Sequence, residues 1–539
     1  MLSSLLTVFA FAAQQSTPAP KADACAPPPG AVAPSLPAKL LNGQGKIDFK
    51  ITTKSAEAQA FFNQGVAQMH SFWAREAERS FLQAAALDPE AAMPQWGIAM
   101  VAAGDYRPGF QLDLVNGVVP KPAKTAAKPQ GGAARAVAAA AKAKQLSTNA
   151  TDLEKLYIAA AAARRDLSQR DPNVGYVKAL RALLAKYPTE IEARTYLALH
   201  IMSGFELPSK RPRPGSMEAV EILRAAIKDS PDHPGAHHYV IHGWEGSTFA
   251  KEAWPSCQRY GDLANNIPHG LHMPGHIYAQ TGRWADAIKA FDTAATNEVY
   301  WMKQDSLSGN GHHGHNVHFL IASYSFQGQF DKALAAAKGL LEYKETPREV
   351  KQVDNFRTAY RQGWFAMMRT LVQHEKWDLI LDGTTLPDHQ KPREQAWRHW
   401  AIAQAQLAKR NRAQAEDAAG KMHNALVDYK AQVKQKAPPA LVVAQLELKA
   451  HMAGNDNKKI QLLERAARDE RAIRYTEPTS YPRPVLEVLG QVALKAGKAQ
   501  VAEKAFRQAL EQYPESAGAK AGLRAALQSQ NRPIEAGLD

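Results

Sequence analysis

The feature that most constrains this chain is a pair of histidines that recurs at a fixed distance. His238 and His242 are four residues apart, and His272 and His276 repeat that spacing 34 residues later. A period of 34 residues is typical of a helix–turn–helix unit, which cannot bury its apolar face alone and therefore stacks on similar units. The sequence thus predicts stacked helical hairpins that present the same histidine pair more than once.

Small and aromatic residues at the two ends of the chain indicate the same architecture. Gly65 and Ala77 leave room for two helices to approach, and Phe81 packs against the next unit. Pro89 ends the second helix because it cannot continue the hydrogen-bond ladder. No sustained alternation of apolar and polar residues indicates a β-strand. The predicted fold class is therefore all-α.

These residues resemble the tetratricopeptide repeat superfamily. The chain is also similar to a group of bacterial exported repeat proteins with histidine-rich units, through segment 62–65, the histidine segments and the turn at 477–482. The resemblance implies a tetratricopeptide-type superhelix of helical hairpins, an α-solenoid, whose first helices line a concave groove. It supplies the architecture and little chemistry.

The ends of the chain differ in composition from its middle. Residues 1–14 form a short apolar and Ala-rich run, which predicts a signal peptide and a periplasmic or secreted protein. Residues 15–45 are rich in Pro and Ala and are predicted to form a linker. Two arrays are expected to follow, over 46–345 with the histidine-rich units and over 346–539. No later stretch has the roughly 20 apolar residues that cross a bilayer.

Charge and cysteine content narrow the function classes. The net charge of +14 comes from Lys and Arg that are scattered, without a dense run or interleaved aromatic residues. We therefore expect no nucleic-acid partner. Cys25 and Cys257 form no Cys-x-x-Cys pair, so a thiolate metal site is not indicated, and a disulfide between them stays open. The oligomeric state is not defined by the sequence.

The histidine pairs share one register on their helices. Because successive residues turn by about 100°, His272 and His276 point about 110° away from the packing face of a helix that starts near Leu271. A third pair keeps the same register after one longer unit, which contains an insertion at 297–311. Seven side chains are thus expected on one groove wall: His238, His242, His272, His276, His315, His318 and Glu245.

Histidines four residues apart can offer two imidazoles to one metal ion. Six imidazoles and Glu245 exceed one tetrahedral shell, so the pattern implies either two ions or histidines in an outer layer. The candidate metals are Cu, Zn and Fe. Pro274 argues against His272, because a helix that started after Met273 would turn His272 away.

Other histidines are interpreted as packing, loop or back-face residues: His70, His237, His269, His312 and His313. Three functions remain open. The groove binds a transition metal, with an enzyme as the outcome if Glu245 serves as acid/base or ligand. Alternatively, the array is a scaffold for a peptide or protein without metal. The third function is metal storage or delivery without turnover.

Overall fold

The computed structural model describes residues 37–105, 129–304, 310–343 and 358–538, except positions 167, 170, 435, 474, 475 and 477. The predicted signal peptide, most of the predicted linker, Cys25 and the boundary predicted at 345/346 lie outside the described residues. The described part of the predicted linker, 37–45, contacts the first hairpin, where Gln64 accepts a hydrogen bond of 2.7 Å from the backbone N–H of Leu41.

The described chain consists of helices, without a β-strand in these ranges. Its first part contains α1 (Ala56–His70), α2 (Ala74–Leu87), α3 (Ala92–Val101), α5 (Gly131–Leu146), η1 (Ser147–Asn149), α6 (Asp152–Arg164), α7 (Pro172–Lys186), α8 (Ile191–Ile201) and α9 (Pro214–Asp229). Its middle contains α10 (Pro234–Trp244), η2 (Ala250–Ala253), α11 (Trp254–Leu263), α12 (Pro268–Gln280), α13 (Trp284–Gln304), α14 (Asn310–Phe326) and α15 (Phe330–Glu342).

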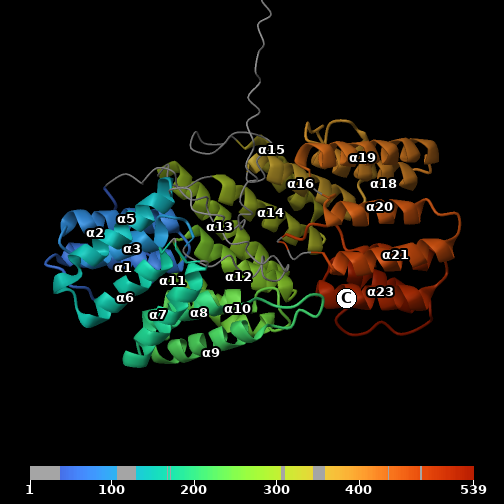
Figure 1. Ribbon diagram of the computed structural model, residues 1–539. Helices are drawn as coiled ribbons and strands as arrows, with labels where there is room; N and C mark the ends of the chain where they lie inside the picture. Colours follow the sequence, from blue (N-terminus) through green and yellow to red (C-terminus); the bar gives the residue numbers. More distant parts are fainter. Residues whose placement is uncertain are drawn as a thin grey trace, which may run out of the picture.

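The last part contains α16 (Ala359–Gln373), α17 (Trp377–Leu381), α18 (Pro392–Ala408), α19 (Arg412–Val433), α20 (Pro439–His451), α21 (Asp456–Arg471), α22 (Val485–Lys495), α23 (Ala499–Gln512) and α24 (Ala517–Gln528). Consecutive helices pack as hairpins, such as α12 with α13 and α18 with α19. Figure 1 shows the hairpins following one another from α1 to α23, with α12 to α16 in the centre. The predicted all-α array of helical hairpins is therefore confirmed.

Close helix pairing in three hairpins depends on a glycine that faces a phenylalanine. The pairs are Gly65 with Phe81, Gly275 with Phe291 and Gly490 with Phe506. A Cβ added to any of these glycines would lie 2.5–2.6 Å from the ring. Such a distance is shorter than van der Waals contact, so a larger residue would push the two helices apart.

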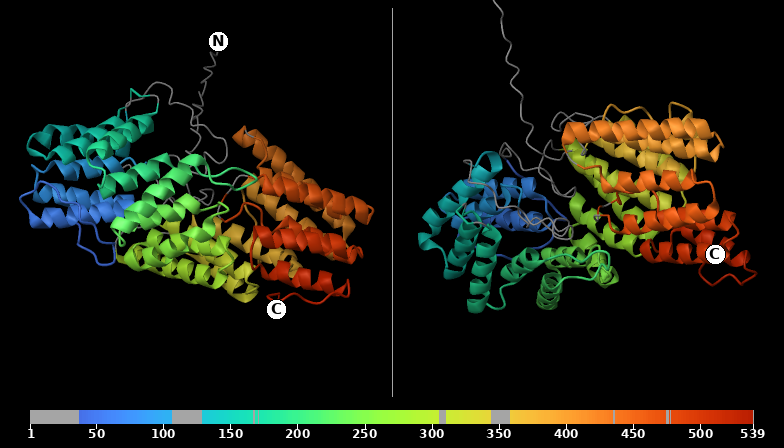
Figure 2. Two further views of the ribbon diagram at one scale, coloured as in Figure 1. Left: turned by 90° about the horizontal axis from the view of Figure 1, so that it is seen from below. Right: turned by 45° about the vertical axis from the view of Figure 1, so that its right-hand side comes forward.

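The buried apolar residues form two clusters that meet within α14. One runs from Ala38 to Leu320 and the other from Ile321 to Leu538. In Figure 2 the N-terminal and C-terminal hairpins lie on opposite sides of the middle helices. Helix α14 therefore contributes buried residues to both cores.

Hairpins that are distant in the chain also contact one another. At the end of the first hairpin, the ring of Phe72 lies 4.5 Å from that of His238 on α10. Further along, the Trp284 indole N–H of α13 donates to the backbone oxygen of Pro514 at 2.9 Å, and Phe326 of α14 stacks on Tyr513 at 4.9 Å. The first contact covers histidines of α10, and the other two join the middle helices to the last hairpins.

Two boundaries in the middle of the chain differ from the sequence-based expectation. Helix α12 begins at Pro268, three residues before the expected start near Leu271, and it continues through Pro274. Helix α13 continues to Gln304, so the first half of the expected insertion at 297–311 is helical. The earlier start of α12 follows from Pro268, because proline suits the first turn of a helix.

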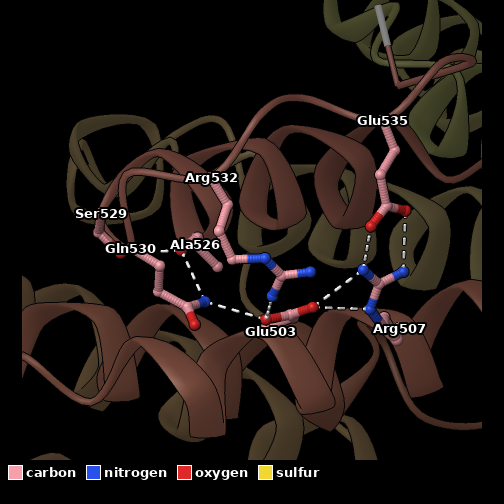
Figure 3. Close-up of polar contacts among 7 residues, drawn as sticks. All are labelled: Glu503, Arg507, Ala526, Ser529, Gln530, Arg532 and Glu535. Atoms are coloured by element: carbon pink, nitrogen blue, oxygen red, sulfur yellow. Dashed lines mark hydrogen bonds and ion pairs between the residues drawn. The ribbon is translucent and has the colours of Figure 1, made fainter.

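The chain end is held on the last hairpins by a polar network (Figure 3). Glu503 on α23 pairs with Arg507 at 2.9 Å and with Arg532 at 2.6 Å, and it accepts a hydrogen bond of 2.9 Å from Gln530. Arg507 also pairs with Glu535. These contacts pin the tail that follows α24. No helix in the described ranges has the length and apolar character needed to span a membrane.

Candidate metal centre

Helices α10, α12 and α14 bring histidines from three consecutive hairpins into the interior. Both α10 and α12 carry a proline in the first turn, Pro234 and Pro268, where the missing N–H costs no hydrogen bond. Because α12 is already helical before Pro274, His272 stays on its inner face. The argument that Pro274 would turn His272 away is therefore wrong.

The first histidine group consists of His238 and His242 from α10 and His269 from α12. One ligand nitrogen from each lies within 4.8 Å of the other two. All three side chains are at most 4 % exposed, and the Phe72 ring covers them. Ligand nitrogens sit about 2 Å from a bound ion, so small movements would bring these three to one ion.

The second histidine group consists of His272 and His276 from α12 and His315 from α14. Its ligand nitrogens also lie within 4.8 Å of one another, and the residues are at most 3 % exposed. The Nε2 atoms of His272 and His276 are 2.5 Å apart. The Phe319 ring stacks on His276 at 4.7 Å and closes one side of the group.

Glu245, the C-cap residue of α10, lies between the two groups. Its Oε2 is 2.9 Å from Nδ1 of His242, and its Oε1 is 2.5 Å from Nδ1 of His276. Burial opposes ionisation of this carboxyl, but His276 and the two hydrogen bonds hold its pKa well below its ordinary value. The ionised carboxylate only accepts, so both imidazoles carry their proton on Nδ1. In the neutral form of these imidazoles, each Nε2 presents a lone pair.

His238 has the same tautomer for a different reason. Its Nδ1 lies 2.5 Å from the backbone oxygen of His70, an obligatory acceptor, so the proton belongs on Nδ1. Its Nε2 faces Nε2 of His269 at 3.2 Å. Burial holds the pKa values of His269 and His272 well below the ordinary value. The imidazoles of His269 and His272 are therefore neutral, which is the form that binds metals.

A seventh imidazole, from His312 on α14, lies beside both groups. Its ring centroid is 5.5 Å from that of His272 and 5.9 Å from that of His269. Its Nδ1 bonds to Glu298 of α13 at 2.9 Å, while its Nε2 is buried and has no hydrogen-bond partner among the described residues. His312 and Glu298 therefore extend the polar centre toward α13.

His318 does not lie with the other five predicted histidines. Its Nδ1 lies 2.7 Å from Oε1 of Gln362, and its ring is 5.9 Å from that of Phe365 on α16. Burial, with a contribution from the charge of Arg369, lowers the pKa of His318 to about 3. His318 lies three residues beyond His315, so its side chain is about 60° short of a full turn from that of His315. At this angle it faces α16.

A third group, His70, Glu192 and His233, also places its ligand atoms within 4.8 Å of one another. Here the ligand atoms are joined by hydrogen bonds. Nδ1 of His233 accepts the backbone N–H of Ala236 at 3.0 Å, which puts its proton on Nε2, and this N–H donates to Glu192 at 3.0 Å. The remaining Glu192 oxygen bonds to His70 at 2.6 Å. The donor atoms of this group are thus engaged with one another.

Sequence reasoning missed His269, His312 and Glu298. His269 was interpreted as a loop residue because the helix was expected near Leu271, and Pro268 is the signal that moves its start. The participation of Glu298 depends on α13 continuing into the expected insertion. In contrast, His237 fits the back-face interpretation, since its ring nitrogens bond to Ser256 at 3.2 Å and the Pro231 oxygen at 2.8 Å.

Comparisons with known proteins extend this description little. No protein-family model matches the chain, and no curated protein does. Among solved structures, the TPR domain of P58(IPK) is 12% identical over 88% of this chain and 99% of that chain, with a TM-score of 0.21.

Two structures of the human IFIT1 dimer also match. The one with PPP-AAAA is 11% identical over 88% of this chain and 91% of that chain, with a TM-score of 0.30. The one with m7Gppp-AAAA is 10% identical over 89% and 91%, with a TM-score of 0.29. The assignment of the all-α fold is therefore based on the helices of this chain.

Proposed function

We propose that this protein binds transition-metal ions through the buried imidazoles of α10, α12 and α14. The observation that carries the proposal is the oxygen acceptor beside Nδ1 of each of His238, His242 and His276. Each Nδ1 donates to a fixed oxygen, so each Nε2 directs a lone pair into the interior. An imidazole oriented by a carboxylate or backbone carbonyl behind it is the usual arrangement of a metal-bound histidine.

The donor set favours metals that accept neutral imidazole nitrogen, namely Cu, Zn or Fe. Each histidine group offers three protein ligands, and three ligands leave a coordination position open for water or another small molecule. This is the pattern of catalytic metal sites, whereas structural zinc sites are closed by four ligands. In this proposal Glu245 is a positioning residue, since both its oxygens are engaged by imidazoles.

The test is the metal content of the full chain purified without a histidine tag and loaded separately with Cu, Zn and Fe(II). The wild type is expected to retain at least one equivalent of one metal after dialysis. A His238→Ala/His276→Ala variant should lose it. The matched control, His237→Ala/His318→Ala, also removes two buried histidines from the same region and should retain the metal.

A wild-type protein that retains none of the three metals would overturn the proposal. So would a double variant at His238 and His276 that keeps the wild-type metal content. An array without metal would leave the scaffold for a peptide or protein as the remaining function.

A further inference from the structure

We propose that the two histidine groups hold two metal ions, one in each, and that Glu245 couples the binding of one ion to that of the other. This inference rests on the proposed metal-binding function. The two groups adjoin on α12, where His269 belongs to the first group and His272 to the second, with ring centroids 6.2 Å apart. Neither group shares a histidine with the other.

The geometry separates the groups because each uses a different pair of helices. Helix α10 supplies two imidazoles to the first group, and α14 supplies His315 to the second. Helix α12 lies between and contributes to both. A single ion in one group would therefore leave a second, separate set of three imidazoles beside it.

Glu245 is the physical link between the groups. Its Oε2 accepts from His242 of the first group, and its Oε1 accepts from His276 of the second. An ion on Nε2 withdraws electron density from the ring, which makes Nδ1–H a stronger donor to the shared carboxylate. The carboxylate then supports the other imidazole less well. Because the two ions also repel each other, we expect the second ion to bind more weakly than the first.

The charge of the buried carboxylates determines whether anions must accompany the two metal ions. The carboxylates of Glu245 and Glu298 are 8 % and 4 % exposed and contribute two negative charges. Two divalent ions would bring four positive charges, and an uncompensated buried charge is costly. We therefore expect small anions such as hydroxide at the open coordination positions. A pair of monovalent Cu ions would need no added anion.

The experiment is a titration of the metal-free full chain with Zn(II), followed by calorimetry and elemental analysis. Two equivalents are expected for the wild type. His238→Ala should retain only the ion of the second group, and His315→Ala only that of the first. Glu245→Gln should retain both ions with affinities lowered by about 10–100-fold. His237→Ala, next to His238 on α10, is the matched control and should bind two ions.

A measurement on the wild type alone guards against variants that fold poorly. With two equivalents of Cu(II), the electron paramagnetic resonance signal should be broadened or diminished by interaction between neighbouring ions. With one equivalent it should be that of isolated Cu(II).

The outcomes separate the two proposals. If the wild type binds one ion and both His238→Ala and His315→Ala abolish it, the two-ion inference is wrong and the metal-binding function stands. If the wild type binds none, the function itself is overturned. If Glu245→Gln weakens only one ion or neither, the coupling is wrong.

Discussion

At the scale of single residues, the neighbouring acceptor decides which nitrogen of a histidine is available. His237 and His238 are adjacent in the chain, yet their nitrogens face different environments. Those of His237 bond to the Ser256 hydroxyl and the Pro231 backbone oxygen, whereas His238 donates from Nδ1 and turns Nε2 toward His269. Composition alone would treat the two residues as equivalent, although only His238 turns a ring nitrogen toward the other histidines of its group.

Burial also sets the charge of Glu470 on α21, and this provides a test by pH. Burial raises the pKa of Glu470 to about 8, against an opposing hydrogen bond of 2.8 Å from the Val485 backbone N–H. The folded state therefore binds more protons than the unfolded state between about pH 4.5 and pH 8. Stability contributed by the protonated carboxyl is present below that window and is lost as the pH rises through it.

Glu470→Gln removes this titration while keeping the shape of the side chain. We expect the variant to gain stability relative to the wild type as the pH rises, by roughly 1 kcal/mol per pH unit within the window and no further above it. Urea unfolding of both proteins at pH 5, 7 and 9 measures the difference. A difference that is the same at all three pH values would show that Glu470 does not titrate with a raised pKa.

At the scale of the element, the glycine–phenylalanine contacts fix how closely two helices of a hairpin approach. Gly490 on α22 faces the Phe506 ring of α23, and a Cβ there would lie 2.5 Å from it. Gly420 lies within α19, and a Cβ at that position would meet nothing within 4 Å. The same substitution should therefore have opposite effects at these two helical positions.

We expect Gly490→Ala to destabilise the protein by about 1–3 kcal/mol through overpacking. Gly420→Ala should stabilise it by about 0.5–1 kcal/mol, because alanine loses less backbone entropy in a helix. Thermal unfolding of the two variants beside the wild type measures both effects. Equal shifts of the same sign would contradict the packing role assigned to Gly490.

At the scale of the whole molecule, contacts between distant hairpins close the array. The Trp284 indole stacks on Phe326 at 4.7 Å and donates to the Pro514 backbone oxygen, which lies 230 residues further along the chain. This contact joins the start of α13 to the turn before α24. It therefore holds the last hairpins against the helices that carry the histidines.

Trp284→Ala should remove both the stacking and the hydrogen bond, at a cost of about 3–5 kcal/mol. Backbone hydrogen exchange should become faster in α13 and α24 together. Trp284→Phe keeps an aromatic ring and loses only the hydrogen bond, so a cost of about 0.5–1.5 kcal/mol is expected. Unchanged exchange in α24 of the alanine variant would show that this contact does not couple the two segments.

The sequence by itself determined the helical hairpins and the register of the histidines. The 34-residue period and the small residues opposite Phe81 act through contacts within one repeat unit or between neighbouring units. Such contacts can be predicted from the spacing of residues along the sequence. For the same reason, His238 and His242 could be placed on one helix face with His272 and His276. Five of the six predicted histidines meet in the two groups.

Only the tertiary structure decided which side chains meet and whether water reaches them. Phe72, which covers the first group, belongs to the first hairpin. In the sequence that hairpin lies far from α10, since His70 and His238 are 168 residues apart. The start of α12 at Pro268 brings in His269, and the packing of α14 on α16 places His318 against Gln362. Local periodicity fixes the direction of a side chain on its helix, whereas the curvature of the array, set by contacts between distant hairpins, fixes what that side chain faces.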